Sequence, residues 1–178
     1  MNTSVVKFDS TMLNLLPQPQ EEFEIIGKLI PKYDGIEWSL SEELFGESYM
    51  KIYPDDEYDP NIYIDNPNKA AFIAMLDGRR IGSLRVGKRW NKNAFVDDLL
   101  VEKNYRGCGV GTMLMDAAVA WGMENGLHGI SLETQDNNLL ACRFYLKYGF
   151  KLGGIDRNVY DVFPNRNETA LYFYYLHQ

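Results

Sequence analysis

The run Arg106-Gly107-Cys108-Gly109-Val110-Gly111-Thr112 has residue types and spacing suited to holding an anion. Glycines let backbone amides approach a ligand closely, and the start of a helix favours negative charge. A pyrophosphate would fit such a loop. No Gly-Lys-Ser/Thr follows, and the spacing is not Gly-x-Gly-x-x-Gly, so the loop is neither a Walker loop nor a dinucleotide fingerprint. The alternative is a glycine-rich turn that only caps a helix.

A second run with chemical potential extends from Asn138 to Phe150. Asn138 follows a predicted strand and either caps the next helix or binds a ligand. Tyr145 lies two turns further along that helix. Its phenol would be placed to give a proton to a leaving group, or else the ring only packs in the interior.

The sequence gives little support to cysteine nucleophiles or to a metal site. Cys108 lies inside the glycine-rich loop and Cys142 lies on the second predicted helix, without a nearby histidine in the sequence. We interpret both as structural. Two cysteines and two histidines form no zinc-site or disulfide pattern, so we expect no metal.

The elements that position these runs follow from the apolar pattern. Asp77-Gly78 is a two-residue hairpin signal, and Gly126 and Gly149 are helix stops. The order predicts an α/β fold with a mixed, mostly antiparallel sheet, flanked by helices and splayed at its central strands. Strands are expected over 70–76, 79–90, 94–101, 129–133, 150–153 and 169–176, and helices over 112–125 and 139–148.

The N-terminal third is harder to interpret. Residues 1–20 are polar and are expected to form a lead-in. Residues 21–30 fit either a strand or a helix. Residues 39–50 are expected to form a helix with Ser39 or Ser41 as its N-cap. Residues 34–65 carry many acids and several tyrosines, with one basic residue, Lys51.

Length and composition favour a single domain over residues 1–178. The 46% of hydrophobic and 24% of charged residues are ordinary for a soluble globular protein. A net charge of −7 argues against nucleic acid and suits a cationic partner. No stretch reaches the length of a membrane span, and no signal peptide is evident, so we expect no membrane partner and a cytoplasmic location.

Taken together, the two runs resemble the GNAT family of N-acetyltransferases. In that family an Arg/Gln-x-x-Gly-x-Gly/Ala loop holds the pyrophosphate of coenzyme A, and here Arg106, Gly109 and Gly111 occupy its positions. The later Asn-x-x-Ala-x-x-Phe-Tyr-x-x-x-Gly-Phe segment is also typical. The resemblance covers about 70–153 and implies that acetyl-CoA is the cosubstrate. It implies contacts from the loop 106–112, from Asn138 and Tyr145, and from the backbone of Leu99, Leu100 and Val101.

A closer resemblance is to the streptothricin acetyltransferases. It is carried by Leu132-Glu133-Thr134-Gln135, by Ala141 to Tyr145, by Leu152-Gly153-Gly154, and by Ala170 to Phe173, together with Asp97-Asp98 in the central strand. Those enzymes acetylate an amine on the β-lysine arm of a cationic antibiotic. The resemblance therefore implies a cationic small-molecule amine as acceptor and a role in antibiotic resistance.

The expected reaction is direct attack of the amine on the thioester. An alkyl amine is protonated near neutral pH, so a base must remove a proton. The candidates are Asp97, Asp98 and Glu133, or a water relay. Asp97 and Asp98 point to opposite faces of their strand unless a bulge intervenes. Backbone amides near Leu100 would polarise the carbonyl, and Tyr145 would protonate the thiolate.

Other interpretations stay open from the sequence. The acidic segment 34–65, within an acceptor side of about 20–65, would attract a polycation or is only a solvated face. A protein or peptide N-acetyltransferase and a non-catalytic acyl-CoA-binding regulator are the alternatives in function, and a nucleotide-binding module is a weaker one. The aromatic strand 169–176 is either an edge that pairs a homodimer or a buried strand.

Overall fold

A computed structural model describes residues 3–16, 19–54 and 57–177 of the chain. Its contacts divide the chain into two compact units. The first unit contains 1–21, 52–130 and 176–178, and the second contains 22–51 and 131–175. The single domain expected over residues 1–178 stays a prediction.

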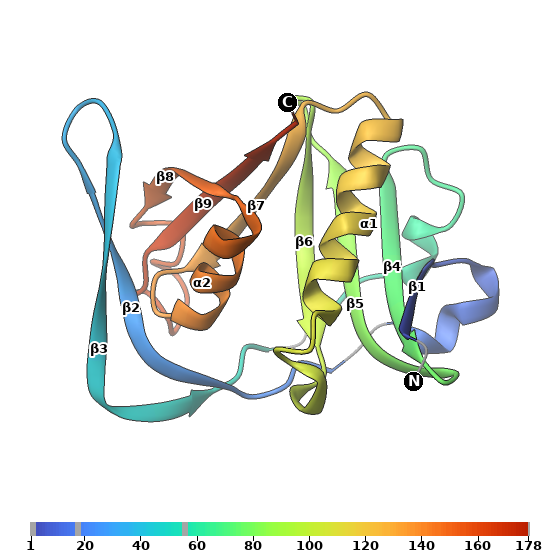
Figure 1. Ribbon diagram of the computed structural model, residues 1–178, viewed down its shortest axis with the longest axis horizontal. Helices are drawn as coiled ribbons and strands as arrows, with labels where there is room; N and C mark the ends of the chain where they lie inside the picture. The colour runs from blue at the N-terminus through green and yellow to red at the C-terminus, as the bar shows by residue number, and fades with distance from the viewer. Residues whose placement is uncertain (1–2, 17–18, 55–56, 178) are drawn as a thin grey trace. The chain divides into compact units, whose positions relative to one another are not determined.

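The first unit is built on antiparallel strands in the order β1-β4-β5-β6. Helix α1 packs against β4, β5 and β6 and buries Leu114, Met115 and Ala118 (Figure 1). A second apolar cluster gathers Phe8, Leu16, Tyr63, Ala71 and Ile73. The elements are β1 (Thr3–Lys7), the 3₁₀ helices η1 (Ser10–Leu15), η2 (Pro60–Tyr63) and η3 (Lys103–Tyr105), β4 (Lys69–Leu76), β5 (Arg79–Lys88), β6 (Asn93–Val101) and α1 (Val110–Glu124).

The second unit contains a ribbon of two strands and a group of three. Strands β2 (Phe23–Tyr33) and β3 (Trp38–Lys51) form the ribbon, and helix α2 (Leu139–Tyr148) packs against β2. Strands β7 (Gly129–Gln135), β9 (Ala170–Leu176) and β8 (Lys151–Asp156) follow in the order β7-β9-β8 (Figure 1). Because β9 has a neighbour on each side, it is an interior strand. It therefore offers no edge for a dimer, and dimerisation itself stays a prediction.

Most of the predicted elements are confirmed. Asp77 and Gly78 both have positive φ, of 48° and 82°, and join β4 to β5 as the hairpin signal indicated. Helix α2 spans the predicted residues, and Gly149 ends it at a φ of 115°. The α/β class with a mostly antiparallel sheet flanked by helices is confirmed. The splay of the central strands stays a prediction.

The expected helix over 39–50 is wrong, because these residues form β3. The ladder with β2 runs from Tyr33–Trp38 to Phe23–Lys51. Ser39, the expected N-cap, instead donates its hydroxyl across the ribbon to the Lys32 carbonyl at 3.3 Å. At the turn, the Asp34 carboxylate accepts from two backbone amides, those of Ile36 and Glu37. The turn and the ladder supply the backbone hydrogen bonds, and this pairing outweighs the local preference for a helix.

Candidate active site

The glycine-rich loop leaves an open approach to the start of α1. Gly107 and Gly109 have φ values of +76° and +86°, and a Cβ added at either would meet nothing within 4 Å. Gly109 is the N-cap of α1, and no side chain among the described residues caps that helix. The first-turn amides are therefore without a side-chain acceptor, which is the arrangement that favours an anion.

Arg106 is fixed between the loop and the end of β6. Its Nε donates to the Val101 carbonyl at 2.9 Å, and its Nη2 lies 3.2 Å from a Glu21 carboxylate oxygen. The backbone N–H of Lys103 donates to the same oxygen at 2.8 Å. Glu21, which the sequence did not single out, therefore holds both the arginine and the turn before it.

A β-bulge in β6 decides where Asp97 and Asp98 point. Arg85 pairs with Asp98 and Val86 pairs with Val96, so Asp97 is the extra residue. Asp97 lies 2.9 Å from the Arg89 guanidinium, and Asp98 lies 3.7 Å from that of Arg85. The simple alternation of faces expected along this strand is therefore broken. Both acids are paired with an arginine, and their role as a base stays a prediction.

The three residues that follow the bulge, Leu99 to Val101, lie opposite β5. Their ladder partners are Leu84, Ser83 and Gly82. Gly82 comes close to the backbone there, since an added Cβ would lie 2.8 Å from the Leu100 carbonyl oxygen. The end of β6 is therefore tightly fixed on its β5 side, which gives its backbone groups a defined position. The expected pantetheine contacts of these residues stay a prediction.

In the second unit, Asn138 is the N-cap of α2. Its Oδ1 accepts from the Ala141 backbone N–H at 3.3 Å. β2 runs beside it: Gly27 forms an isolated parallel bridge with Asn138, and the Leu29 N–H donates to the Asp136 carbonyl at 2.8 Å. The capping interpretation of Asn138 therefore has direct support, and its role as a ligand for the cosubstrate stays a prediction.

Tyr145 lies on α2 within an aromatic cluster. The residue is 9% exposed, and its ring centroid lies 5.8 Å from that of Phe150 and 6.1 Å from that of Phe173. These rings hold the phenol in one position through stacking and edge contacts. The packing role of Tyr145 therefore has direct support, and its role as a proton donor stays a prediction.

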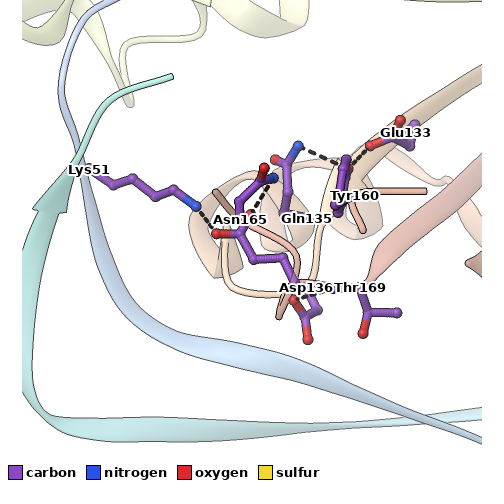
Figure 2. A network of polar contacts seen from close by, with 8 residues as sticks. Lys51, Glu133, Gln135, Asp136, Tyr160, Asn165 and Thr169 are labelled. Atoms are coloured by element: carbon purple, nitrogen blue, oxygen red, sulfur yellow. Dashed lines mark hydrogen bonds and ion pairs between the residues drawn. The ribbon is translucent and has the colours of Figure 1, made fainter. Parts of the chain in front are cut away.

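Glu133, the third acid, is bound by a phenol. Tyr160, between β8 and β9, donates its hydroxyl to the Glu133 carboxylate, and the Gln135 amide donates to the same hydroxyl at 3.0 Å (Figure 2). In the described part of the chain, Glu133 has no ion-pair partner. The sequence did not predict a role for Tyr160, because nothing in the run 157–169 marks one residue as a contact of strand β7.

A half-buried ion pair joins the end of β3 to the segment before β9. Lys51 contacts Glu168, with side chains 17% and 12% exposed, and Asn165 donates to the other Glu168 oxygen at 3.2 Å (Figure 2). Burial lowers the pKa of Lys51, while the charge of Asp136 acts in the opposite direction. The one basic residue of the acidic segment therefore has a structural position.

Several acids of the segment 34–65 are also used by the fold. The Arg143 guanidinium lowers the pKa of Glu42 by hydrogen bonding, and this pair connects α2 to β3. Glu43 lies 3.7 Å from Lys28, and Asp59 caps η2. The expected contribution of Asp55 and Asp56 lies outside the described residues. The segment is therefore partly structural, and its contact with an acceptor stays a prediction.

The two cysteines differ sharply in environment. Cys142 is fully buried on α2, and burial raises the pKa of its thiol to about 12. A thiol with such a pKa stays neutral at physiological pH and is a poor nucleophile. Cys108 is exposed in the loop.

The described residues contain neither a metal-binding group nor a membrane-spanning helix. Within 3–16, 19–54 and 57–177, no group of three or more His, Cys, Asp or Glu side chains is arranged to hold a metal ion. Within the same ranges, no helix is long and apolar enough to cross a membrane.

Comparison with known proteins identifies the family of this chain. The model of the acetyltransferase (GNAT) family matches residues 38–150. The chain belongs to the GNAT family of acetyltransferases.

Three relatives define its place in that family more narrowly. Streptothricin acetyltransferase A of Bacillus subtilis is 40% identical over 158 residues, which is 89% of this chain and 91% of the relative. A Bacillus anthracis protein provisionally assigned as a streptothricin acetyltransferase, solved in complex with acetyl coenzyme A, is 35% identical, with a TM-score of 0.90 over 100% of both chains. Nourseothricin acetyltransferase is 26% identical, with a TM-score of 0.81 over 98% of both chains.

Proposed function

We propose that this N-acetyltransferase transfers the acetyl group of acetyl-CoA to an amine of streptothricin and so confers resistance to it. The similarity to a streptothricin acetyltransferase over nearly the whole chain carries the proposal. That match covers 89% of this chain and so extends beyond the family motifs. The acceptor is a cation, and the net charge of −7 suits it.

The residues of the first unit fit the anionic end of acetyl-CoA. Gly107 and Gly109 have positive φ, and among the described residues, chain neighbours aside, a Cβ added at either would have no atom within 4 Å, which would leave room for a ligand beside the loop. Arg106 would face the pyrophosphate, and the Leu99–Val101 backbone would bind the pantetheine. Gly111 and Thr112 lie in the first turn, where their amides would complete the anion site. Acetyl-CoA supplies the acetyl group as a thioester.

Glu133 is the acid that best suits the role of general base. Asp97 and Asp98 each contact an arginine, which leaves the carboxylate engaged in an ion pair. Glu133 contacts a neutral phenol. It would take the proton of the acceptor ammonium, directly or through water, and the Leu100 N–H would polarise the carbonyl. Tyr145 would give its proton to the departing sulfur.

Release of coenzyme A from acetyl-CoA tests the proposal. The purified protein is assayed with streptothricin, with a panel of aminoglycosides and with a lysine-bearing peptide. We expect turnover with streptothricin, and mass spectrometry should show one added acetyl group. Turnover with the peptide alone would favour a protein N-acetyltransferase. No turnover with any amine, despite tight binding of acetyl-CoA, would favour a regulator.

A further inference from the structure

Tyr160 bridges two residues of one strand. Glu133 and Gln135 are two positions apart on β7, so their side chains leave the same face. Tyr160 reaches them from the segment between β8 and β9, which contains no helix or strand among its described residues. Its hydroxyl contacts both side chains at once (Figure 2).

The direction of these hydrogen bonds follows from the donors available. The Gln135 amide nitrogen can only donate, so the Tyr160 oxygen accepts there. A phenol has a single proton, and that proton is therefore directed to the Glu133 carboxylate. Gln135 thus fixes Tyr160 as a hydrogen-bond donor to the Glu133 carboxylate.

The surroundings of Glu133 make such a donor useful. Tyr160 is 8% exposed, and its contact with Glu133 is partly buried. Tyr172, on the neighbouring strand β9, has its pKa raised by burial first and then by the charges of Glu133 and Asp156. The phenol of Tyr160 contacts Glu133, and Tyr172 lies within the electrostatic reach of both Glu133 and Asp156. None of Tyr160, Tyr172 and Asp156 offers a positive charge to the Glu133 carboxylate.

We propose that Tyr160 is a positioning residue for acetyl transfer, holding the Glu133 carboxylate in one orientation for the acceptor amine. This inference rests on the proposed function, in which Glu133 is the base. It adds a residue outside the motifs of the family. It also gives the segment 157–169 a part in the reaction beyond linking β8 to β9.

The test is the pH dependence of kcat at saturating acetyl-CoA and streptothricin for Tyr160→Phe. Phenylalanine keeps the ring and removes the donor. Removing a hydrogen bond to the charged form of a carboxyl group disfavours that form. A base acts when deprotonated, so kcat falls on the low-pH side of its pH profile, which we call the acid limb. In Tyr160→Phe this acid limb should move to higher pH by about one unit, and most of the activity should be recovered at pH values above the limb.

Two further variants complete the design. Tyr174→Phe removes a β9 hydroxyl that has no hydrogen bond with Glu133 in the described structure, and its limb should match the wild type. Gln135→Met removes the group that directs the Tyr160 proton, so its limb should move the same way by a smaller amount. This variant keeps the inference testable if Tyr160→Phe does not fold.

The outcomes separate this inference from the proposed function. A uniform fall in kcat with an unmoved limb, in Tyr160→Phe or in Gln135→Met, would overturn the inference, because Tyr160 would then only support the loop. A Glu133→Gln enzyme that retains the acid limb would overturn it too, while wild-type turnover with streptothricin would still stand. A wild type without that turnover contradicts the proposed function instead.

Discussion

At the scale of single residues, the proposed role of Tyr145 can be tested by a substitution that keeps the ring and removes the hydroxyl. Its ring packs on Phe150 and Phe173. Phenylalanine retains these contacts, so Tyr145→Phe should fold with an unchanged melting temperature. Loss of the proton donor should lower kcat by about 100-fold or more, with little change in the KM for acetyl-CoA.

Steady-state kinetics beside thermal unfolding check this expectation. Tyr148→Phe, on the same helix and in contact with Phe150, is the matched control because it also removes one phenol from the cluster. If Tyr145→Phe keeps its kcat, the residue only packs and another group protonates the sulfur.

The thiols offer a second test at this scale. Burial raises the pKa of Cys142 to about 12, whereas Cys108 is exposed. A neutral, buried thiol does not react with alkylating reagents. Iodoacetamide at pH 8 should therefore modify Cys108 alone in the folded protein, and both residues in denaturant. Peptide mass spectrometry gives the sites, and native labelling of Cys142 would mean that α2 opens readily.

Acetyl-CoA should protect Cys108 from that reagent. The residue lies between Gly107 and Gly109, in the loop proposed to face the pyrophosphate. Labelling should therefore slow as acetyl-CoA approaches saturation, while a control with free adenosine should leave the rate unchanged. A labelling rate indifferent to acetyl-CoA would place the pyrophosphate elsewhere.

At the scale of elements, local signals decided which predictions held. The Asp77-Gly78 turn and α2 were predictable because each depends on a few adjacent residues. β3 was not, because its conformation depends on pairing with β2 rather than on its own residues. β1, within the expected lead-in, was missed for the same reason, since its partner β4 lies far along the chain.

The site shows the same division. The glycine loop and Asn138 could be located from motifs, because consecutive residues form them. A bulge near Asp97 and Asp98 was considered from the sequence, but its position could not be predicted, because it is defined only by the pairing of β6 with β5. The contacts of Tyr160 and Glu21 were not predicted, because their partners are distant in sequence and no motif includes them.

Asn138 can be tested as a cap independently of any ligand. Its Oδ1 accepts from the Ala141 N–H. Asn138→Ala should lower the free energy of unfolding by about 0.5–2 kcal/mol, while Asn138→Asp should keep it, because aspartate caps equally well. Denaturant unfolding measures both. If Asn138→Asp restores stability but not the KM for acetyl-CoA, the amide also contacts the cosubstrate; full recovery of both would leave only the cap.

For the whole molecule, charge is the property that acts beyond any one contact. The net charge is −7, yet Glu42 and Glu43 face basic side chains within the fold. Attraction of a cationic acceptor therefore depends on the summed field rather than on a single carboxylate. Such a field is screened over a Debye length of about 10 Å at 0.1 M salt and about 3 Å at 1 M.

The KM for streptothricin should consequently rise with salt, by about tenfold between low and high ionic strength, while kcat stays nearly constant. A monoamine acceptor should respond less, because the interaction scales with its charge. Steady-state kinetics in sodium chloride with both acceptors measure the difference. Equal salt dependence for the two acceptors would show that the field does not select the polycation. The acidic segment would then serve the fold through its ion pairs and caps, and acceptor choice would depend on direct contacts alone.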